Sequence, residues 1–593
     1  MSSPAPDLND ALRGGMMLEV VTNNVVPMTR PTASGERRFE VRDDGTFLID
    51  HSGQGTRLCG RLEVVSMVRD VGGGSWGKLL RWYDGDGRLH QHIMQNADLE
   101  AEGTEIVRKL LDGGLDIPPV SRRGAVRQAL LEYLAGTVDS RTRIVSRIGW
   151  HERVFALFDE TIGEGFEAVV YAGPTPDRAW TEAGTLADWN TNVARYAGGN
   201  SRLLLGVAAA FAAPTLTRLG VEGFGLHFVG SSSCGKTTTG LVASSVYADP
   251  ASFRSTWRAT SNGLEAQAAQ HNDALFFLDE LGQCDPEQAS EAAYMLANGT
   301  GKSRANVRGG ARESQRWRVL VLSTGEEDLD ARLRGIGKRS RAGQAVRLLN
   351  LPADAGAGLG AFEDLHGASS PAEFANRLAA NTARYFGAPL RPWLLKLSQV
   401  DETTWAQLRQ HVSDFAAELA GNERTGQARR AAEKFAVLAI AGELAIDSGV
   451  VALPEGTFKS AVETSFCAWQ SRFGLGSHED RAIVEHARDY LFRHAASRFA
   501  TRPRDDRPSV LNRVGYAFEK NGEKFLAMPP GSFKSELCAG RDPRVVADVL
   551  FRAGLLAPGN EGGGQTKGVR VPGDDKVSRL YLFRTAMLEE GGE

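Results

Sequence analysis

The sequence is poor in the features that mark several common classes of protein. Its 593 residues contain five cysteines, which lie far apart and form no C-x-x-C pair, so the spacing of a zinc ribbon or a dithiol redox site is absent. Acidic residues slightly outnumber basic ones, and the formal net charge of -4 argues against a uniformly basic nucleic-acid coat. Any nucleic-acid site must therefore be a local concentration of lysine and arginine.

Long apolar runs and a secretion signal are also lacking. The longest run, LLLGVAAAFAAPTL from Leu203, is interrupted by Pro214 and followed by Arg218. It is shorter than the ~20 residues that cross a bilayer, so it predicts a buried helix. The first residues, MSSPAPDLNDALRGG, have neither the basic start nor the apolar core of a signal peptide. We therefore expect a cytoplasmic protein with reduced cysteines and no membrane partner.

The periodicity of apolar residues predicts several domains. Alternation and frequent turns indicate strands near the amino terminus, strands and helices alternate in the middle, and spacing of three and four residues dominates later. The predicted order is a β-rich amino-terminal domain over 1–115, a connecting α/β region over 116–199, an α/β core over 200–355, a helical lid over 356–476 and a winged-helix domain over 477–593.

An acidic turn lies in the first of these domains. Residues 84–87, with the sequence DGDG, separate two strand-like runs and predict a hairpin turn. Paired acids can also belong to the metal site of a primase. A hairpin tip explains this pair without a metal, and no second acidic group stands nearby in the sequence.

A phosphate-binding loop is the strongest motif. The stretch GSSSCGKT fits G-x-x-x-x-G-K-[ST] and lies between an apolar strand and a helix, as the mechanism requires. Glycines let backbone N–H groups point at the phosphates, lysine reaches the β and γ oxygens, and threonine binds Mg2+. The predicted nucleotide-binding residues are Gly230, Ser231, Ser232, Ser233, Cys234, Gly235, Lys236, Thr237 and Thr238.

An acidic pair follows on the next buried strand. In HNDALFFLDELGQ, the apolar run Leu275 to Leu278 delivers Asp279 and Glu280 to its carboxyl end. Asp279 is predicted to hold Mg2+ together with Thr237, and Glu280 to orient or deprotonate the attacking water. The alternative is a strand end that carries two surface acids.

A further strand, Val319 to Leu322, ends in Ser323 and Thr324. A hydroxyl beside the acidic strand could bond the γ-phosphate or the attacking water, the role called sensor 1. A plain cap of the following turn explains these hydroxyls equally well.

A local concentration of basic residues lies in the chain between the acidic strand and the strand that ends in Ser323 and Thr324. The segment GKSRANVRGGARESQRWR has six cations and one acid, and RGG at 308–310 makes a turn between two short extended arms. Such a hairpin can project into the centre of a ring and hold the phosphates of a nucleic acid strand. A solvated loop is the alternative. The predicted DNA-binding residues are Lys302, Arg304, Arg308 and Arg312.

A second basic cluster, ARLRGIGKRSRAGQAVRLLNLP, contains no acid. In ring ATPases an arginine just before the last core strand completes the site of the neighbouring subunit. With that strand predicted over 345–351, Arg341 is the first choice and Arg339 the second, whereas Arg347 inside the strand could instead pair with a carboxylate. Arg429 and Arg430 are candidates for a second sensor or simply an ordinary charged helix start.

Several motifs together resemble a known family. The segments are SRIGWHERVF, HFVGSSSCGKTTTG, WRATSNGLEAQAAQHNDALFFLDELGQ, AAYMLANGTGKSRA, WRVLVLSTGE, AGQAVRLLNLPAD and FAVLAIAGELA, which span roughly 136–469. In this order they resemble the family called domain of unknown function 927. The resemblance implies an AAA+ P-loop ATPase core, similar to that of minichromosome-maintenance helicases, with a carboxyl-terminal winged helix, on plasmids, phages and other mobile elements.

The expected function is an ATP-dependent, ring-forming DNA helicase of mobile-element replication, with ATP and Mg2+ as cofactors. A homohexamer is expected because the site needs an arginine from a neighbouring subunit. The expected partner is single-stranded or forked DNA, and a primase and a single-strand-binding protein are candidate partners. The alternative is an AAA+ replication initiator or helicase loader that binds DNA and uses ATP for assembly without unwinding. The N-K-x-D motif of GTPases and the L-S-G-G-Q motif of transporter ATPases are absent from the sequence.

Overall fold

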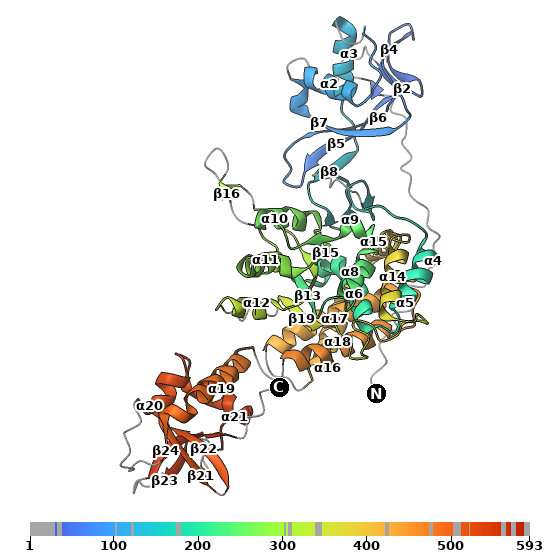
Figure 1. Cartoon of the computed structure of the whole chain (residues 1–593). Coiled ribbons are helices and arrows are strands. Elements are labelled where there is room, and N and C mark those ends of the chain that lie inside the picture. Colours follow the sequence, from blue (N-terminus) through green and yellow to red (C-terminus); the bar gives the residue numbers. More distant parts are fainter. Residues whose placement is uncertain are drawn as a thin grey trace, which may run out of the picture. The chain divides into compact units, whose positions relative to one another are not determined.

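The computed structural model has an α/β fold that falls into two compact units (Figure 1). The smaller unit is formed mainly by Cys467–Glu593, and the larger contains most of the chain before it. The residues that the structure describes are 30–31, 38–100, 103–119, 124–173, 180–301, 304–305, 311–312, 314–338, 347–421, 426–473, 478–501, 512–520, 522–558, 565–570 and 577–585.

The amino-terminal region contains two sheets. The first is antiparallel and follows the chain order, with strands β1 Arg30–Pro31, β2 Arg38–Arg42, β3 Gly45–Ile49 and β4 Gly55–Cys59. The second is mixed and has the order β12-β8-β5-β6-β7, from β5 Leu62–Asp70, β6 Gly77–Tyr83, β7 Leu89–Gln95, β8 Arg141–Val145 and β12 Ala168–Tyr171. Both β8 and β12 come from the stretch predicted to be a separate connecting region, and β8 pairs in parallel with β5.

The predicted hairpin at residues 84–87 is confirmed. Strands β6 and β7 pair antiparallel up to Tyr83 and Leu89. The Asp84 carboxylate accepts hydrogen bonds from the backbone N–H groups of Asp86 and Arg88, both at 2.9 Å, and Gly87 has a positive φ of 77°. The acids of this segment therefore shape the turn, as Asp side chains commonly do.

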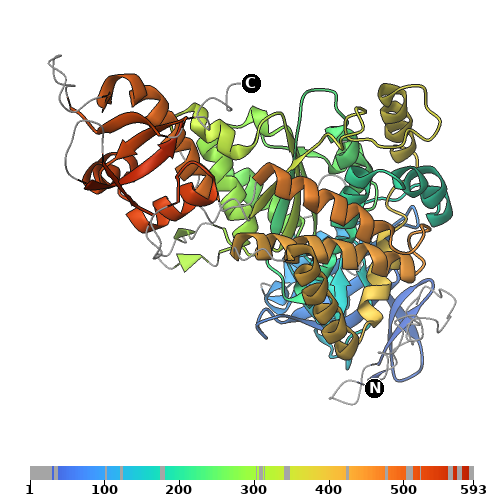
Figure 2. The ribbon, with the colours of Figure 1, turned by 90° about the horizontal axis from the view of Figure 1, so that it is seen from below.

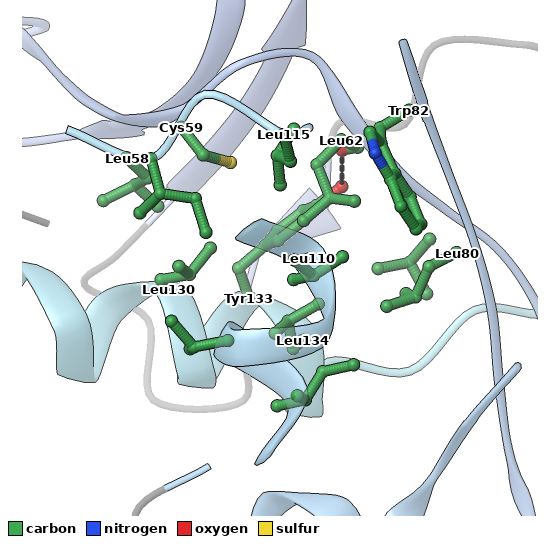
Figure 3. Close-up of a cluster of buried hydrophobic side chains, with 14 of the residues drawn as sticks. Leu58, Cys59, Leu62, Leu80, Trp82, Leu110, Leu115, Leu130, Tyr133 and Leu134 are labelled. Atoms are coloured by element: carbon green, nitrogen blue, oxygen red, sulfur yellow. Dashed lines mark hydrogen bonds between the residues drawn. The ribbon is translucent and has the colours of Figure 1, made fainter. Parts of the chain in front are cut away.

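Two helices, α2 Thr104–Asp112 and α3 Gly124–Ala135, pack on the second sheet. Figure 3 shows the core that results, in which leucines from the sheet and from both helices meet around Trp82 and Tyr133. The Tyr133 hydroxyl donates a hydrogen bond to the Leu62 carbonyl oxygen at 2.6 Å, and the Trp82 ring N–H donates to Gly113 at 2.8 Å. Both large side chains thus bury apolar area without leaving a polar group unpaired.

A small sheet of β9 Gly149–His151, β10 Val154–Ala156 and β11 Thr161–Ile162 lies in the chain between β8 and β12. Its Trp150 backbone N–H donates to the buried carboxylate of Asp273 at 3.1 Å. Burial raises the pKa of Asp273, which also accepts a hydrogen bond from Thr217. This junction joins the small sheet to the chain just before strand β15, Ala274–Asp279, of the core.

The core is a five-stranded parallel sheet. Its strand order is β14-β15-β18-β13-β19, so the second and fifth of these strands in the chain, β14 and β19, do not lie next to the strands that precede them. The bounds are β13 Phe224–Val229, β14 Ser255–Thr256, β15 Ala274–Asp279, β18 Val319–Gly325 and β19 Leu348–Pro352. Strands β13, β15 and β18 are buried along their whole length, as expected for a sheet covered on both faces.

Helices cover both faces of this sheet. Phe277 of β15 contacts α8, whereas its neighbours Phe276 and Leu278 point to the other face and join the core of α10, α11 and α12. The helices of the core are α4 Leu186–Trp189, α5 Arg195–Ala197, α6 Ser201–Ala212, α7 Leu216–Leu219, α8 Lys236–Ser244, α9 Pro250–Phe253, α10 Ser261–Gln270, α11 Pro286–Asn298 and α12 Leu329–Gly335.

The predicted buried helix is confirmed as α6, in which every residue is buried. Within the described part of the chain, the stretch Ser201–Leu219 is the one helical stretch long and apolar enough to cross a membrane, but 89% of it is buried inside the protein. It is therefore a core helix.

The chain after β19 is helical, as predicted for the lid. The helices are α14 Pro371–Thr382, α15 Leu390–Gln399, α16 Glu402–Ala420, α17 Gly426–Asp447 and α18 Thr457–Phe473. Helices α16, α17 and α18 lie side by side (Figure 2), with Phe435 packed edge-to-face against Phe466 and Lys459 bonded to Glu418.

The smaller unit combines helices with one sheet. The sheet has the order β20-β21-β22-β24-β23, and all its pairs are antiparallel except β20 with β21. Its elements in chain order are α19 His478–Arg498, β20 Phe499–Ala500, β21 Gly515–Lys520, β22 Glu523–Met528, α20 Pro530–Ser532, a π-helical turn Phe533–Leu537, α21 Pro543–Arg552, β23 Lys567–Arg570 and β24 Val577–Arg584.

Candidate functional site

The phosphate-binding loop connects β13 to α8, as the sequence predicts. Helix α8 begins at Lys236, and Gly235 before it has a φ of 95°, in the left-handed region that favours glycine. A Cβ at Gly235 would also lie 2.9 Å from the ring of Phe362, and Ala361 donates its N–H to the Cys234 carbonyl at 2.8 Å. The segment after β19 thus packs directly against the loop and fixes its curvature.

Lys236 lies over the loop. Its Nζ donates hydrogen bonds to the carbonyl oxygens of Gly230 at 2.9 Å and of Ser231 at 2.6 Å, and the residue is buried. The ammonium group is therefore held at the mouth of the loop by backbone oxygens. A phosphate oxygen that binds there must replace at least one of these partners.

The acidic pair lies at the carboxyl end of β15, beside the start of α8. The hydroxyl of Thr237 is 3.4 Å from both carboxylate oxygens of Asp279. A hydroxyl and a carboxylate are the hard oxygen ligands that Mg2+ prefers, so these two residues fit the predicted metal site. Asp279 is buried, which keeps this carboxylate away from bulk water.

A hydroxyl from β18 ties the two acids together. The Thr324 hydroxyl donates to Asp279 and accepts a hydrogen bond from the backbone N–H of Glu280 at 3.1 Å. This contact arises because β18 lies between β13 and β15, although it follows them in the chain. Glu280 itself has a φ of 61°, unusual for a residue with a side chain.

Ser323 points to the opposite face of the sheet. Its hydroxyl accepts a hydrogen bond from the Trp257 ring N–H at 2.9 Å and lies 2.8 Å from Nδ1 of His227, all of them buried. Nε2 of His227 lies 3.2 Å from the Glu327 carbonyl oxygen, which can only accept a hydrogen bond. In a neutral ring Nε2 therefore carries the proton, and Nδ1 accepts a hydrogen bond from the Ser323 hydroxyl. Of the two predicted sensor residues, Thr324 is the one whose side chain lies at the acidic pair.

Two arginines near the acids were not among the predicted site residues, although Arg332 belongs to the second basic cluster. Arg254 is 3.4 Å from Asp279, because the two-residue strand β14 that follows it pairs with β15. Arg332, on α12, donates to the carbonyl oxygens of the loop after Glu280. A strand as short as β14 has no detectable period, so the strand order alone brings Arg254 to the site.

The predicted basic hairpin has the expected arms. Strand β16 Arg304–Ala305 pairs antiparallel with β17 Ala311–Arg312, and Arg304 stands directly opposite Arg312. Like charges at directly opposed positions destabilise a ribbon unless an anion neutralises them. Lys302 and Arg308 lie outside the described residues.

The candidate finger residues Arg339 and Arg341 also lie outside the described residues. The last core strand, β19, begins at Leu348, three residues later than predicted. Arg347 just before it lies over the ring of Tyr294, with its guanidinium carbon 4.4 Å from the ring centroid. Arg429 and Arg430 are exposed in the first turn of α17.

No cluster of three or more histidine, cysteine or acidic side chains that could hold a metal ion occurs among the residues that the structure describes. In the acidic turn of β6 and β7, Asp84 also bonds His90 at 2.8 Å. The His90 hydrogen bond and the backbone N–H groups of the turn lower the pKa of Asp84.

Comparison with known proteins adds two findings to this geometry. A solved structure described as "SCCmec type IV Cch - active helicase" has a TM-score of 0.63 and 16% sequence identity, and the match covers 93% of this chain and 98% of that chain. At this identity the likeness shows a shared fold over nearly the whole chain. A search of curated proteins finds no match.

The family model matches a shorter part of the chain than the solved structure does. The match begins nearer the amino terminus than the family motifs indicated, and it ends before β18. Residues 39–316 match the model of the family described as "Domain of unknown function (DUF927)", which confirms the resemblance for this part of the chain.

Proposed function

We propose that the protein is an ATP-dependent, ring-forming DNA helicase of mobile-element replication. The observation that carries the proposal is the meeting of three elements at one point. Thr237 of the phosphate-binding loop and Thr324 of the sensor strand both contact Asp279, and Glu280 follows directly. This meeting of groups supports hydrolysis of a nucleoside triphosphate over binding alone.

ATP and Mg2+ are the proposed cofactors. Thr237 and Asp279 would hold the metal, and Lys236 would bind phosphate oxygens. When bound, the metal supplies positive charge that offsets the charge of the phosphates. Glu280, placed beyond Asp279 and bonded through its N–H to Thr324, is the proposed base or orienting group for the attacking water.

DNA binding is assigned to the basic hairpin. The hairpin lies between α11 and β18 in the chain, so the strand after its second arm is the one that carries Thr324. The opposed pair Arg304 and Arg312 is the feature that best supports a polyanionic partner.

Ring formation and a carboxyl-terminal DNA-binding domain complete the proposal. Arg341, or else Arg339, is proposed to reach the site of the next subunit of a homohexamer. The smaller unit is proposed to be a winged helix, because the π-helical turn and α21 separate β22 from the ribbon of β23 and β24. The solved structure that shares the fold is described as an active helicase, which agrees with unwinding.

A strand-displacement assay tests the function. Forked DNA with either a 3′ or a 5′ tail is incubated with ATP and the protein, in parallel with Glu280→Gln. Unwinding from one tail by the wild type, and none by the variant, is the expected result. Tight DNA binding with no displacement from either fork would instead indicate an initiator or helicase loader that uses ATP for assembly.

A further inference from the structure

The loop after the acidic strand holds Glu280 in an unusual conformation. A φ of 61° is strained for a residue with a side chain, and such conformations persist where the surroundings determine them. The loop continues as a 3-10 turn, Leu281–Gln283, and Asp285 then caps α11. Two backbone hydrogen bonds form within the loop. The Gln283 N–H donates to the Glu280 carbonyl oxygen at 3.1 Å, and the Cys284 N–H donates to the Leu281 carbonyl oxygen at 3.2 Å.

Arg332 adds two bonds from a different helix. Its Nη1 donates to the Leu281 carbonyl oxygen, and its Nη2 donates to the Cys284 carbonyl oxygen at 2.6 Å. The guanidinium group thus spans the turn with the two ends of its planar fork, which a single-point cation cannot do. These bonds fasten the loop of Glu280 to α12.

The backbone around Arg332 is itself fixed. Asp328 caps α12 by accepting a hydrogen bond from the Ala331 N–H at 2.7 Å. Leu329 and Leu333 of the same helix are buried in the cluster that includes Leu281. The arginine therefore acts from a rigid support.

The guanidinium group and the Glu280 carboxylate are both neighbours of Gly282. A Cβ built on Gly282 would be 3.2 Å from Glu280 Oε1 and 3.9 Å from Arg332 Nη1. Glycine leaves room here for both side chains. Displacement of the loop would move the Glu280 carboxylate directly.

We propose that Arg332 is a positioning residue that holds Glu280 in place within its own subunit. The inference rests on the proposed ATPase function and adds a role for one arginine of the second basic cluster. An arginine that completes the neighbour's site must point away from its own site. Arg332 instead has two of its guanidinium nitrogens bonded to its own loop.

Arg332→Ala tests the role, with Arg334→Ala as the matched control. Arg334 is exposed on the same helix, so its replacement removes the same charge and leaves the loop bonds intact. Steady-state ATP hydrolysis by Arg332→Ala should show kcat lowered roughly 10- to 100-fold, because small displacements of a reacting group have effects of this size. Binding of a fluorescent ATP analogue should stay within about twofold of wild type, since the phosphate-binding loop is unchanged.

Hydrogen exchange measures the positioning directly. Amides of the 3-10 turn, including Gln283 and Cys284, should exchange faster in Arg332→Ala and at the wild-type rate in Arg334→Ala. If the alanine variant fails to fold, Arg332→Lys takes its place, with the same direction of change. A fall in kcat without faster exchange would overturn the positioning role, as would wild-type kcat in a folded Arg332→Ala.

Mixing subunits separates action within a subunit from action on a neighbour. Arg332→Ala is mixed with Lys236→Ala, whose own site cannot bind ATP but which supplies an intact Arg332. Hydrolysis should stay at the low level of Arg332→Ala. Recovery of hydrolysis in the mixture would show that Arg332 serves the neighbouring site and would refute the inference. Wild-type protein without ATPase activity would refute the proposed function instead, and the hydrogen-exchange result would then stand alone.

Discussion

Gly240→Ala tests whether the contact between α8 and β15 sets the geometry of the site. Gly240 lies in the middle of α8, and a Cβ there would be 2.0 Å from Cζ of Phe277. Carbon atoms in contact are ordinarily about 3.5–4.0 Å apart. Phe277 is completely buried, so it has no free space into which to turn. The helix must therefore move away from the sheet.

The sign of the stability change follows from two opposing effects. Alanine in place of glycine favours a helix by about 1 kcal/mol. Overpacking of a filled core costs about 1–3 kcal/mol, and an overlap this severe belongs in the upper part of that range. We expect Gly240→Ala to lower the free energy of unfolding by about 1–2 kcal/mol. Because α8 carries Lys236 and Thr237, ATP hydrolysis should fall by more than the loss of folded protein explains.

Urea denaturation and steady-state ATP hydrolysis measure the two effects. Gly263→Ala in α10 is the control, because its Cβ would be no closer than 3.4 Å to any neighbour. That variant should be as stable as wild type or up to about 1 kcal/mol more stable. If Gly240→Ala is stabilised to the same degree, the reasoning is refuted, because α8 and Phe277 would then accommodate the added methyl group without strain.

Three further predictions concern the sensor strand, the hairpin and a buried histidine. Thr324→Val should lower the kcat of ATP hydrolysis about 10- to 100-fold, because the two acids lose the hydroxyl that contacts both. Ser323→Ala should lower the free energy of unfolding by about 1–3 kcal/mol, because it leaves buried polar groups without a hydrogen-bond partner. The kcat of the folded Ser323→Ala protein should stay near wild type. Arg308→Ala combined with Arg312→Ala should abolish DNA stimulation of ATP hydrolysis and spare nucleotide binding; undiminished stimulation would remove the hairpin from the DNA site. Burial lowers the pKa of His271 to about 4, so its contribution to stability is complete above the unfolded pKa of about 6.5 and is lost as the pH falls toward 4, by about 1 kcal/mol at pH 5.5. Urea midpoints at pH 7.5 and 5.5 should therefore differ less for His271→Asn than for wild type, and an equal difference would exclude this histidine.

Much of the geometry of the candidate site could be predicted because its signals are local. The glycines and lysine of the loop stand within eight residues, and Asp279 and Glu280 directly follow an apolar run, so neither prediction needs knowledge of the sheet order. The choice between Ser323 and Thr324 depended on which face of β18 meets β15. Alternation places them on opposite faces but does not say which face meets the acidic pair.

The residues that sequence reasoning missed depend on contacts distant in the chain. Arg254 reaches Asp279 through an edge strand of two residues, and Arg332 contacts a loop about fifty residues earlier in the chain. Neither has a neighbouring residue that marks its role. The start of β19 was placed too early because the apolar pattern continues into residues before Leu348. Strand ends are the least certain part of such a prediction.

The parallel pairing of β8 with β5 has a practical consequence for anyone who wishes to divide the chain. Residues 141–171 finish a sheet that starts at Leu62, and on the way they supply Trp150 to the buried Asp273 beside the acidic strand. A cut after residue 115 would remove β8 and β12 from the sheet of the amino-terminal fragment. The edge of β5 would then be unpaired and could promote aggregation. The other fragment would keep β8 and β12 but lose β5, with which β8 pairs, so residues 62–171 are best kept in one piece.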